Sequence, residues 1–211
     1  MDEVDQFLEF IQKSESHLEL GTKELGIVGI DKDLIKIMKA SAFLVLYNLI
    51  ESTMRNSIQE IYEHLKTKNI PFDMVRSELK KVVLKNLKKP KVENILEKIK
   101  ILSHDVVSAG FDPSDLFSGN VDARLVRDIA EEYGFSSATN SAQTKDGQKL
   151  VIVKTQRNDL AHGNKSFSEV GKEKSITEIM IIRDEVKAFL GEIVDNIDKY
   201  LTNQLYLSSA E

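Results

Sequence analysis

Apolar residues recur at helical spacing along almost the whole chain, and no stretch shows the sustained alternation of a half-buried strand. This pattern constrains the fold most, because each segment must bury one stripe of a helix against another helix. The longest predicted helices span residues 31–68 and 175–207. We therefore expect an all-α helical bundle in which these two helices form the frame.

Local signals mark where the predicted helices begin and end. Asp31 opens the first long helix, and Ser175 forms a capping-box pattern with Glu178 before the second. Pro71 suits the start of another helix, which Pro90 ends. The shorter predicted helices span residues 3–20, 71–88, 91–103, 121–133 and 147–162, and polar or turn-rich loops are expected at 108–120, 136–146 and 164–174.

We expect a single domain over residues 1–211, with residues about 70–135 as a helical insertion or lobe. With 211 residues, of which 41% are hydrophobic, the chain can bury a substantial core. The most apolar run, residues 40–50, is too short to span a membrane, and the acidic residues after Met1 are unlike a secretory signal. A cytoplasmic protein without membrane contact is therefore expected.

The absence of cysteine from the sequence restricts the chemistry that the chain can perform. It excludes disulfides, cysteine-ligated zinc and thiol catalysis. The sequence also contains no metal-ligand spacing and no glycine-rich phosphate loop of a known type. We therefore expect neither a metal nor another cofactor.

Positive charge is concentrated in one segment of a chain whose net charge is −5. Residues 76–100 contain nine lysine or arginine residues and three glutamates, a balance of +6 that leaves −11 for the rest. This basic segment is either a solvated helix face or a flank that binds RNA phosphates. The candidate RNA-binding residues are Lys80, Lys81, Lys85, Lys88 and Lys89 in this segment, and Lys154 outside it.

The densest cluster of chemically versatile side chains is the heptapeptide RNDLAHG at residues 157–163. Asn158 and His162 are four residues apart and share a helix face, and the long Arg157 side chain can reach the same place. Gly163 is suited to ending the helix, where unpaired carbonyl groups point outward near His162. A cation that binds phosphate and an imidazole that moves protons suit RNA cleavage by attack of the ribose 2′-hydroxyl. A histidine beside such a glycine is also commonly only a C-cap, so residue chemistry leaves both interpretations open.

Arg157, the polar Asn158 and His162 match the Arg-x4-His signature of the HEPN superfamily, and the sequence resembles its stand-alone bacterial ribonucleases. The resemblance covers residues about 31–68 and 147–207. It implies a HEPN-like helical bundle in which Arg157, Asn158 and His162 form the active site of a metal-independent RNA endonuclease. The products would carry a 2′,3′-cyclic phosphate. The resemblance also implies a homodimer with the active site at its interface.

A second pattern, Glu51-x3-Arg55, matches a Glu-x3-Arg pair found on an earlier long helix in the same superfamily. The spacing allows a surface ion pair worth a few tenths of a kcal/mol. The two residues interrupt an apolar helix, however, and the resemblance implies a supporting role in orienting the motif helix or lining the cleft. Asp159, inside the motif, is expected to be solvated, and the alternative is an ion pair with a basic neighbour.

Three hypotheses about function follow. The leading one is an RNA endonuclease that acts on RNA such as tRNA or mRNA as a toxin or antiphage-defence effector. The second is a non-catalytic helical module that binds RNA or nucleotide. The third is a protein-interaction partner in a toxin–antitoxin pair. An antitoxin or regulatory partner is compatible with the resemblance, but the next tyrosine after His162 is Tyr200, which disfavours control by modification of a tyrosine near the motif.

Overall fold

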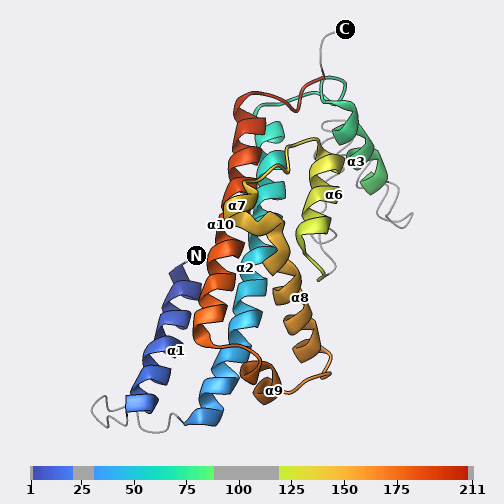
Figure 1. The fold of residues 1–211 in the computed structure, drawn as a ribbon. Helices are drawn as coiled ribbons and strands as arrows, with labels where there is room; N and C mark the ends of the chain where they lie inside the picture. The colour runs from blue at the N-terminus through green and yellow to red at the C-terminus, as the bar shows by residue number, and fades with distance from the viewer. Residues whose placement is uncertain (1, 21–30, 88–118, 209–211) are drawn as a thin grey trace. The chain divides into compact units, whose positions relative to one another are not determined.

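The computed structural model describes residues 2–20, 31–87 and 119–208, and these residues form helices and no strand (Figure 1). Val75 and Leu207 make an isolated antiparallel bridge. The expected all-α helical fold is confirmed, and its two long helices are α2 (Lys32–Thr67) and α10 (Ile176–Thr202). The other elements are α1 (Asp2–Leu20), α3 (Ser77–Leu87), α6 (Ala123–Tyr133), α7 (Ser141–Thr144), the 3-10 turn η2 (Lys145–Gly147), α8 (Gln148–Ala161) and α9 (Phe167–Lys172).

The chain divides into two compact units. Unit 1 comprises Met1–Ser52 and Ser141–Phe189, and unit 2 comprises Thr53–Asn140 and Leu190–Glu211. The helix predicted at 91–103 and most of the loop predicted at 108–120 lie outside the described residues. Within the described ranges, no helix is both long enough and apolar enough to cross a membrane.

Unit 1 buries the apolar stripes of α1, α8 and the portions of α2 and α10 that belong to it. Burial of each large apolar side chain contributes about 1.5–3 kcal/mol, which favours helices whose apolar faces meet. Asp5 also joins α1 to α10, because it accepts hydrogen bonds from Lys187 (2.6 Å) and Arg183 (3.1 Å). The bond from Lys187 is the main reason that the pKa of Asp5 is lowered. Fully buried side chains of this unit include Leu8, Ile11, Phe43, Leu46, Ile50, Leu150, Val153, Ile179, Val186 and Phe189.

The predicted starts of the two long helices are supported by side-chain caps. The Asp31 carboxylate accepts hydrogen bonds from the backbone N–H groups of Asp33 (2.9 Å) and Leu34 (2.8 Å). Ser175 and Glu178 form a reciprocal pair, in which each side chain accepts from the other residue's backbone N–H. These bonds satisfy donors that the first helical turn leaves unpaired.

The expectation of an irregular loop at 164–174 was wrong, because this segment contains α9. Ser166 and Glu169 form a capping box at its start, with the same Ser-x-x-Glu spacing that predicts the start of α10. Gly171 then permits a close approach to α2, since a Cβ atom at this position would overlap the backbone carbonyl of Lys36. The tertiary contact therefore stabilises a helix too short to be expected from periodicity.

The loop expected at 136–146 is also partly helical, because it contains α7 and most of η2. The Ser141 hydroxyl donates a hydrogen bond of 2.6 Å to Asp146, and the Thr144 hydroxyl accepts one of 3.2 Å from the Asp146 backbone N–H. Such local side-chain bonds stabilise short turns without an apolar stripe, so periodicity did not predict them.

Unit 2 contains α3 and α6, which contact each other, and a polar junction formed by Arg76. The Arg76 guanidinium donates two hydrogen bonds of 2.9 Å to the Glu78 carboxylate. It also donates to the backbone carbonyl of Gly134 at 2.7 Å, just after α6 ends. The bidentate pair with Glu78 fixes the guanidinium, and its bond to Gly134 joins the start of α3 to the chain that follows α6.

Two predicted helix boundaries in unit 2 were wrong for the same reason. Helix α3 begins at Ser77 instead of residue 71, and α10 ends at Thr202 instead of residue 207. The Arg76 backbone N–H donates to the Tyr206 carbonyl at 2.8 Å, beside the bridge between Val75 and Leu207. This long-range pairing fixes the two segments in a bridge that is flanked by turns, and this arrangement competes with continuation of either helix.

Replacement of Glu78 by glutamine is expected to destabilise the protein at neutral pH by about 1 kcal/mol after allowance for solvent screening. The hydrogen bonds from Arg76 lower the pKa of Glu78 to about 2 from the ordinary value of 4.5. The pKa of Glu78 is lower in the folded state than in the unfolded state. The stabilisation is therefore present at pH values above the unfolded-state pKa and is lost as pH falls toward the folded-state pKa. Urea unfolding of wild type and Glu78→Gln between pH 7 and 2 measures this difference.

The control for that measurement is Glu60→Gln, at an exposed position on α2 in the same unit. The free energy of unfolding of Glu78→Gln should approach that of wild type as pH falls below about 4.5. Glu60→Gln should show no such pH-dependent difference from wild type. A difference that stays constant down to the lowest pH would contradict the assignment to the Glu78 charge.

Candidate active site

Helix α8 presents the heptapeptide motif, and its residues have two different environments. Leu150 and Val153 are fully buried, and Gln156 continues the same stripe with 8% exposure. Arg157 and Asn158 are half-buried, so they lie at the edge of the core of unit 1. The local sequence therefore anchors α8 by its apolar side and leaves the motif partly accessible to solvent.

The end of α8 places His162 at the C-cap, as the glycine after it predicts. The His162 backbone N–H donates to the Asn158 carbonyl at 3.0 Å, which keeps the two residues in helical register. Gly163 follows with φ +68°, a left-handed conformation that glycine adopts without strain. His162 is exposed and directly follows the last residue of α8, where a substrate in solution can reach it.

Arg157 and Asn158 are in direct contact. The Arg157 Nη1 group donates a hydrogen bond of 3.0 Å to Oδ1 of Asn158. The Arg157 Cζ atom also lies over the ring of Tyr47, 4.7 Å from its centroid. Tyr47 is on α2 in the same unit and is 1% exposed, so the guanidinium rests on a ring fixed in the core.

Ion pairs and hydrogen bonds hold the turn after α8. Lys165 lies 3.2 Å from the Asp159 carboxylate and 2.6 Å from that of Glu173. The bond with Glu173 is the main cause of a raised pKa of Lys165, and the same bond lowers the pKa of Glu173. Glu173 also accepts a hydrogen bond of 2.6 Å from the Gln156 amide. This network joins α8 to the residue that ends α9 and so restrains the turn that carries His162.

The network corrects one expectation and adds residues that the sequence did not single out. Asp159 is not simply solvated, because it pairs with Lys165 and its side chain is only 20% exposed. Gln156 has a signal in the sequence, since it is a polar residue in an otherwise apolar stripe. Lys165 and Glu173 have none, because both lie in a polar segment where charged residues are ordinary.

The other candidate residues are distributed over both units. Glu51 and Lys154 are half-buried in unit 1, and Glu51 lies one helical turn beyond Tyr47 on α2. Arg55 is half-buried and belongs to unit 2. The supporting role of Glu51 and Arg55, and RNA contact by Lys154, stay predictions.

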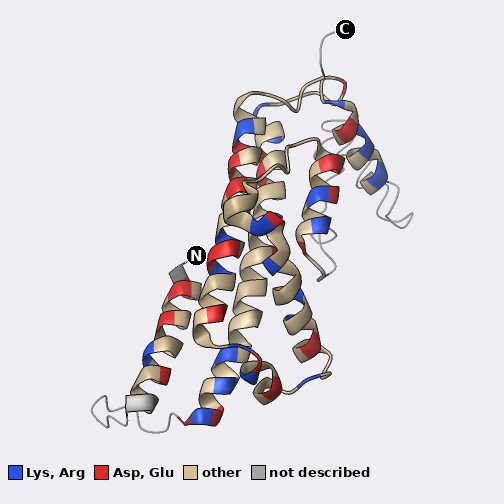
Figure 2. Ribbon diagram, viewed as in Figure 1, with Lys and Arg blue, Asp and Glu red and all other residues tan. Residues whose placement is uncertain are grey.

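The basic segment is described only in part. Lysines follow the acidic start of α3, as Figure 2 shows by colour. Lys80 donates a hydrogen bond of 2.7 Å to the Asp73 carbonyl, and Lys85 forms an ion pair with Glu132 on α6. Lys81 is exposed, and Lys88 and Lys89 lie outside the described residues. Two of the three described lysines thus already have partners within unit 2.

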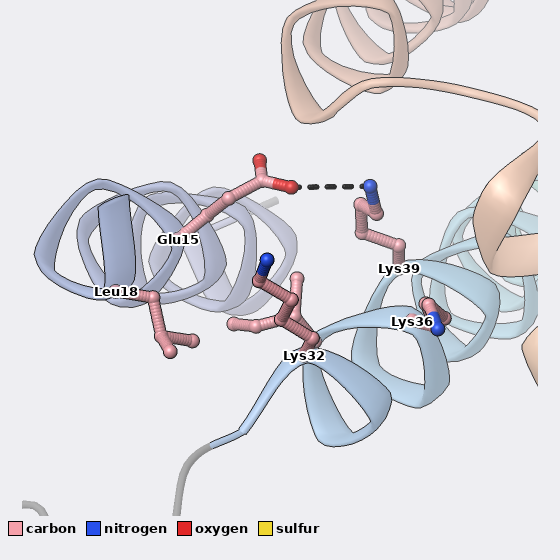
Figure 3. Close-up of a pocket in the computed structure, with 6 residues that line it drawn as sticks. Glu15, Leu18, Lys32, Lys36 and Lys39 are labelled. Carbon is pink, nitrogen blue, oxygen red and sulfur yellow. Dashed lines mark hydrogen bonds and ion pairs between the residues drawn. The ribbon is translucent and has the colours of Figure 1, made fainter.

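A cavity of about 340 Å³ lies between α1 and α2 in unit 1, lined by three lysines, one glutamate and two apolar side chains (Figure 3). The Lys39 ammonium is 3.1 Å from Glu15, and the Lys36 ammonium is 2.7 Å from Asp33. These pairs neutralise most of the positive charge, so the cavity has little attraction for an anion. Among the residues that the structure describes, no group of three or more histidine, aspartate or glutamate side chains could hold a metal ion.

An all-helical chain with Arg157, Asn158 and His162 at the end of one helix has the features of a HEPN protein. The sequence model of the HEPN_MAE_28990-like HEPN family matches residues 1–206. The chain therefore belongs to this family of the HEPN superfamily, as its sequence motif predicts. HEPN proteins are commonly ribonucleases, and membership suggests a nuclease-type or related function. No curated protein and no solved structure matches the chain.

Proposed function

We propose that this protein is an RNA endonuclease that needs no metal and cleaves by attack of a ribose 2′-hydroxyl on the adjacent phosphorus. The attacking oxygen loses its proton and forms a bond to phosphorus, while the bond from phosphorus to the 5′-oxygen breaks and that oxygen gains a proton. The products carry a 2′,3′-cyclic phosphate and a 5′-hydroxyl. In this proposal His162 transfers a proton, Arg157 stabilises the negative charge on the phosphate, and Asn158 orients the Arg157 guanidinium.

The observation that carries the proposal is the contact between Arg157 and Asn158 one helical turn before the exposed His162. Arginine provides a planar set of donors for two phosphate oxygens. Histidine is the side chain best suited to proton transfer near neutral pH. A helix C-cap alone explains His162, but it does not explain an arginine placed over a buried ring five residues earlier on the same helix.

We also propose that the active form is a homodimer. Cleavage by the 2′-hydroxyl needs a base at the attacking oxygen and an acid at the leaving oxygen. The motif contains one imidazole, so two copies related by a two-fold axis would supply both groups in one cleft. Loss of wild-type activity on mixing with an excess of His162→Ala chains, through mixed dimers that hold only one imidazole, would support a shared site, whereas a monomer in light scattering that cleaves RNA would argue against it.

Incubation of the purified chain with total RNA or tRNA in EDTA tests the proposed reaction. Wild type should produce fragments whose 5′-hydroxyl ends accept phosphate from polynucleotide kinase without prior phosphatase treatment. A substrate with a 2′-deoxynucleotide at the cleaved position should resist cleavage. Identical RNA patterns from wild type and His162→Ala would refute the catalytic assignment.

The biological role that we propose is that of a toxin or antiphage-defence effector, with an antitoxin or other regulatory partner. Induction of wild type should slow growth of a bacterial host, and Arg157→Ala should not. Equal growth of both strains, with and without phage challenge, would argue against this role while leaving the biochemical reaction to the RNA assay.

A further inference from the structure

We propose that Tyr47 is a positioning residue of the candidate site, which holds the Arg157 guanidinium in place to receive a phosphate group of RNA. The expected effect of Tyr47 on RNA binding rests on the proposed function, whereas the contact between Tyr47 and Arg157 does not. Tyr47 is 110 residues from Arg157 in the sequence and lies within the apolar run at residues 40–50. Neither the motif nor helical periodicity indicates a role for it.

The ring of Tyr47 is a rigid platform. The side chain is 1% exposed, and its neighbours Phe43, Leu46 and Ile50 on α2 are fully buried. A ring packed in this way has little freedom to turn. The Arg157 Cζ atom, 4.7 Å from the ring centroid, is well inside the distance of about 6 Å at which a cation interacts with an aromatic face.

The position over the ring leaves the guanidinium able to bind a ligand. Contact with an aromatic face does not consume N–H donors, whereas an ion pair with a carboxylate would. Of the five N–H donors of an arginine, one from Nη1 is directed to Oδ1 of Asn158. Others can therefore bind phosphate oxygens while the side chain stays on Tyr47. Half-burial of Arg157 strengthens both interactions because less water competes.

The contacts with Tyr47 and Asn158 thus restrain a long side chain that would otherwise be mobile. Arg157 loses side-chain conformational entropy when the protein folds, so less of this entropy is lost when RNA binds. The same face of α2 carries Glu51 one turn further, which agrees with the supporting role proposed for that residue. Tyr47 is consequently expected to act through Arg157 and not through contact with RNA.

The test compares Tyr47→Phe and Tyr47→Leu with wild type, using the full chain and two readouts that do not require cleavage. The first is the ¹H–¹⁵N NMR signal of the Arg157 side-chain Nε–H group, identified by its absence in Arg157→Ala. The second is the affinity for a 2′-O-methyl oligonucleotide that cannot be cleaved. In wild type and Tyr47→Phe the NMR signal should be shifted by the ring, and in Tyr47→Leu it should move to the position of exposed arginines.

Tyr47→Leu should weaken binding of the oligonucleotide by about tenfold, whereas Tyr47→Phe, which keeps the ring, should stay within about threefold of wild type. In the Arg157→Ala background Tyr47→Leu should have no further effect, because a positioning residue acts only through its partner. A purely structural role would instead lower affinity equally in both backgrounds. If Tyr47→Leu does not fold, progressive fluorination of the ring at position 47 keeps its shape and should weaken binding stepwise.

An unmoved Arg157 signal in Tyr47→Leu would overturn the contact. The positioning role would be overturned if the Arg157 signal moved in Tyr47→Leu but the affinity for the oligonucleotide did not change. It would also be overturned if wild type did not bind the oligonucleotide. Failure of wild type to cleave natural RNA refutes the proposed nuclease function separately, since the NMR signal and the affinity are measured with an uncleavable ligand.

Discussion

Arg157→Ala is expected to lower the rate of RNA cleavage by about 10²–10³-fold, the usual effect of removing a donor that stabilises charge in a transition state. His162→Ala should lower it by about 10²–10⁴-fold, because a proton-transfer group is lost. Arg157→Lys keeps the charge but not the planar set of donors, so it should recover only part of the rate. Single-turnover cleavage of a defined oligoribonucleotide measures these effects.

The stability of each variant separates a chemical effect from a folding effect. His162 is exposed, so His162→Ala should change the free energy of unfolding by less than about 0.5 kcal/mol. Arg157→Ala removes the contact with Tyr47 and should cost about 1 kcal/mol. Arg124→Ala, at an exposed position on α6, is the matched control and should keep the wild-type rate. Loss of cleavage in Arg124→Ala, or a wild-type cleavage rate in Arg157→Ala, would contradict the assignment of Arg157 to the active site.

Gly171→Ala is expected to destabilise the protein by about 2–4 kcal/mol, although alanine is the better helix former. The added methyl group would overlap the Lys36 backbone carbonyl of α2, which cannot move aside as a flexible side chain could. Helix α9 would have to shift away from α2, and Glu173 at its end would shift with it. We therefore expect weaker restraint of the turn that carries His162, in addition to lower stability.

Gly191→Ala is the matched control, because Gly191 is also helical and a Cβ atom there would meet nothing within 4 Å. It should gain up to about 1 kcal/mol from helix propensity alone. Urea unfolding followed by circular dichroism measures both variants. Equal stability of Gly171→Ala and wild type would show that α9 does not approach α2 so closely in solution. Because the chain contains two units, the transition must first be shown to be two-state.

Much of the architecture could be predicted because helices are encoded by local patterns. The apolar stripe after Asp31 and the Ser175–Glu178 box locate the two long helices to within a few residues of their observed starts. The wrong boundaries near Pro71 and Leu207 arise where backbone groups pair with each other across the chain. Helix α9 was missed because it is too short for periodicity, even though its Ser166–Glu169 box was visible.

The sequence indicated the motif residues of the candidate site but not the residues that hold them in place. Arg157, Asn158 and His162 are local to one helix end, and the bond from Arg157 to Asn158 joins sequence neighbours. Membership of the HEPN family agrees with that motif. The partners that restrain the motif, Tyr47 and Glu173, are distant in sequence, and no local pattern distinguishes them from ordinary core or surface residues.

The sequence by itself determined the all-α class, the two long helices and the residues of the motif, because each depends on side chains within a few turns of one helix. Only the tertiary structure decided that the Arg157 guanidinium lies over Tyr47, that Asp159 pairs with Lys165, and that Gly171 lies against α2. The physical reason is that these interactions depend on how separate helices pack. That packing follows from the burial of all apolar stripes together and cannot be read from any one of them.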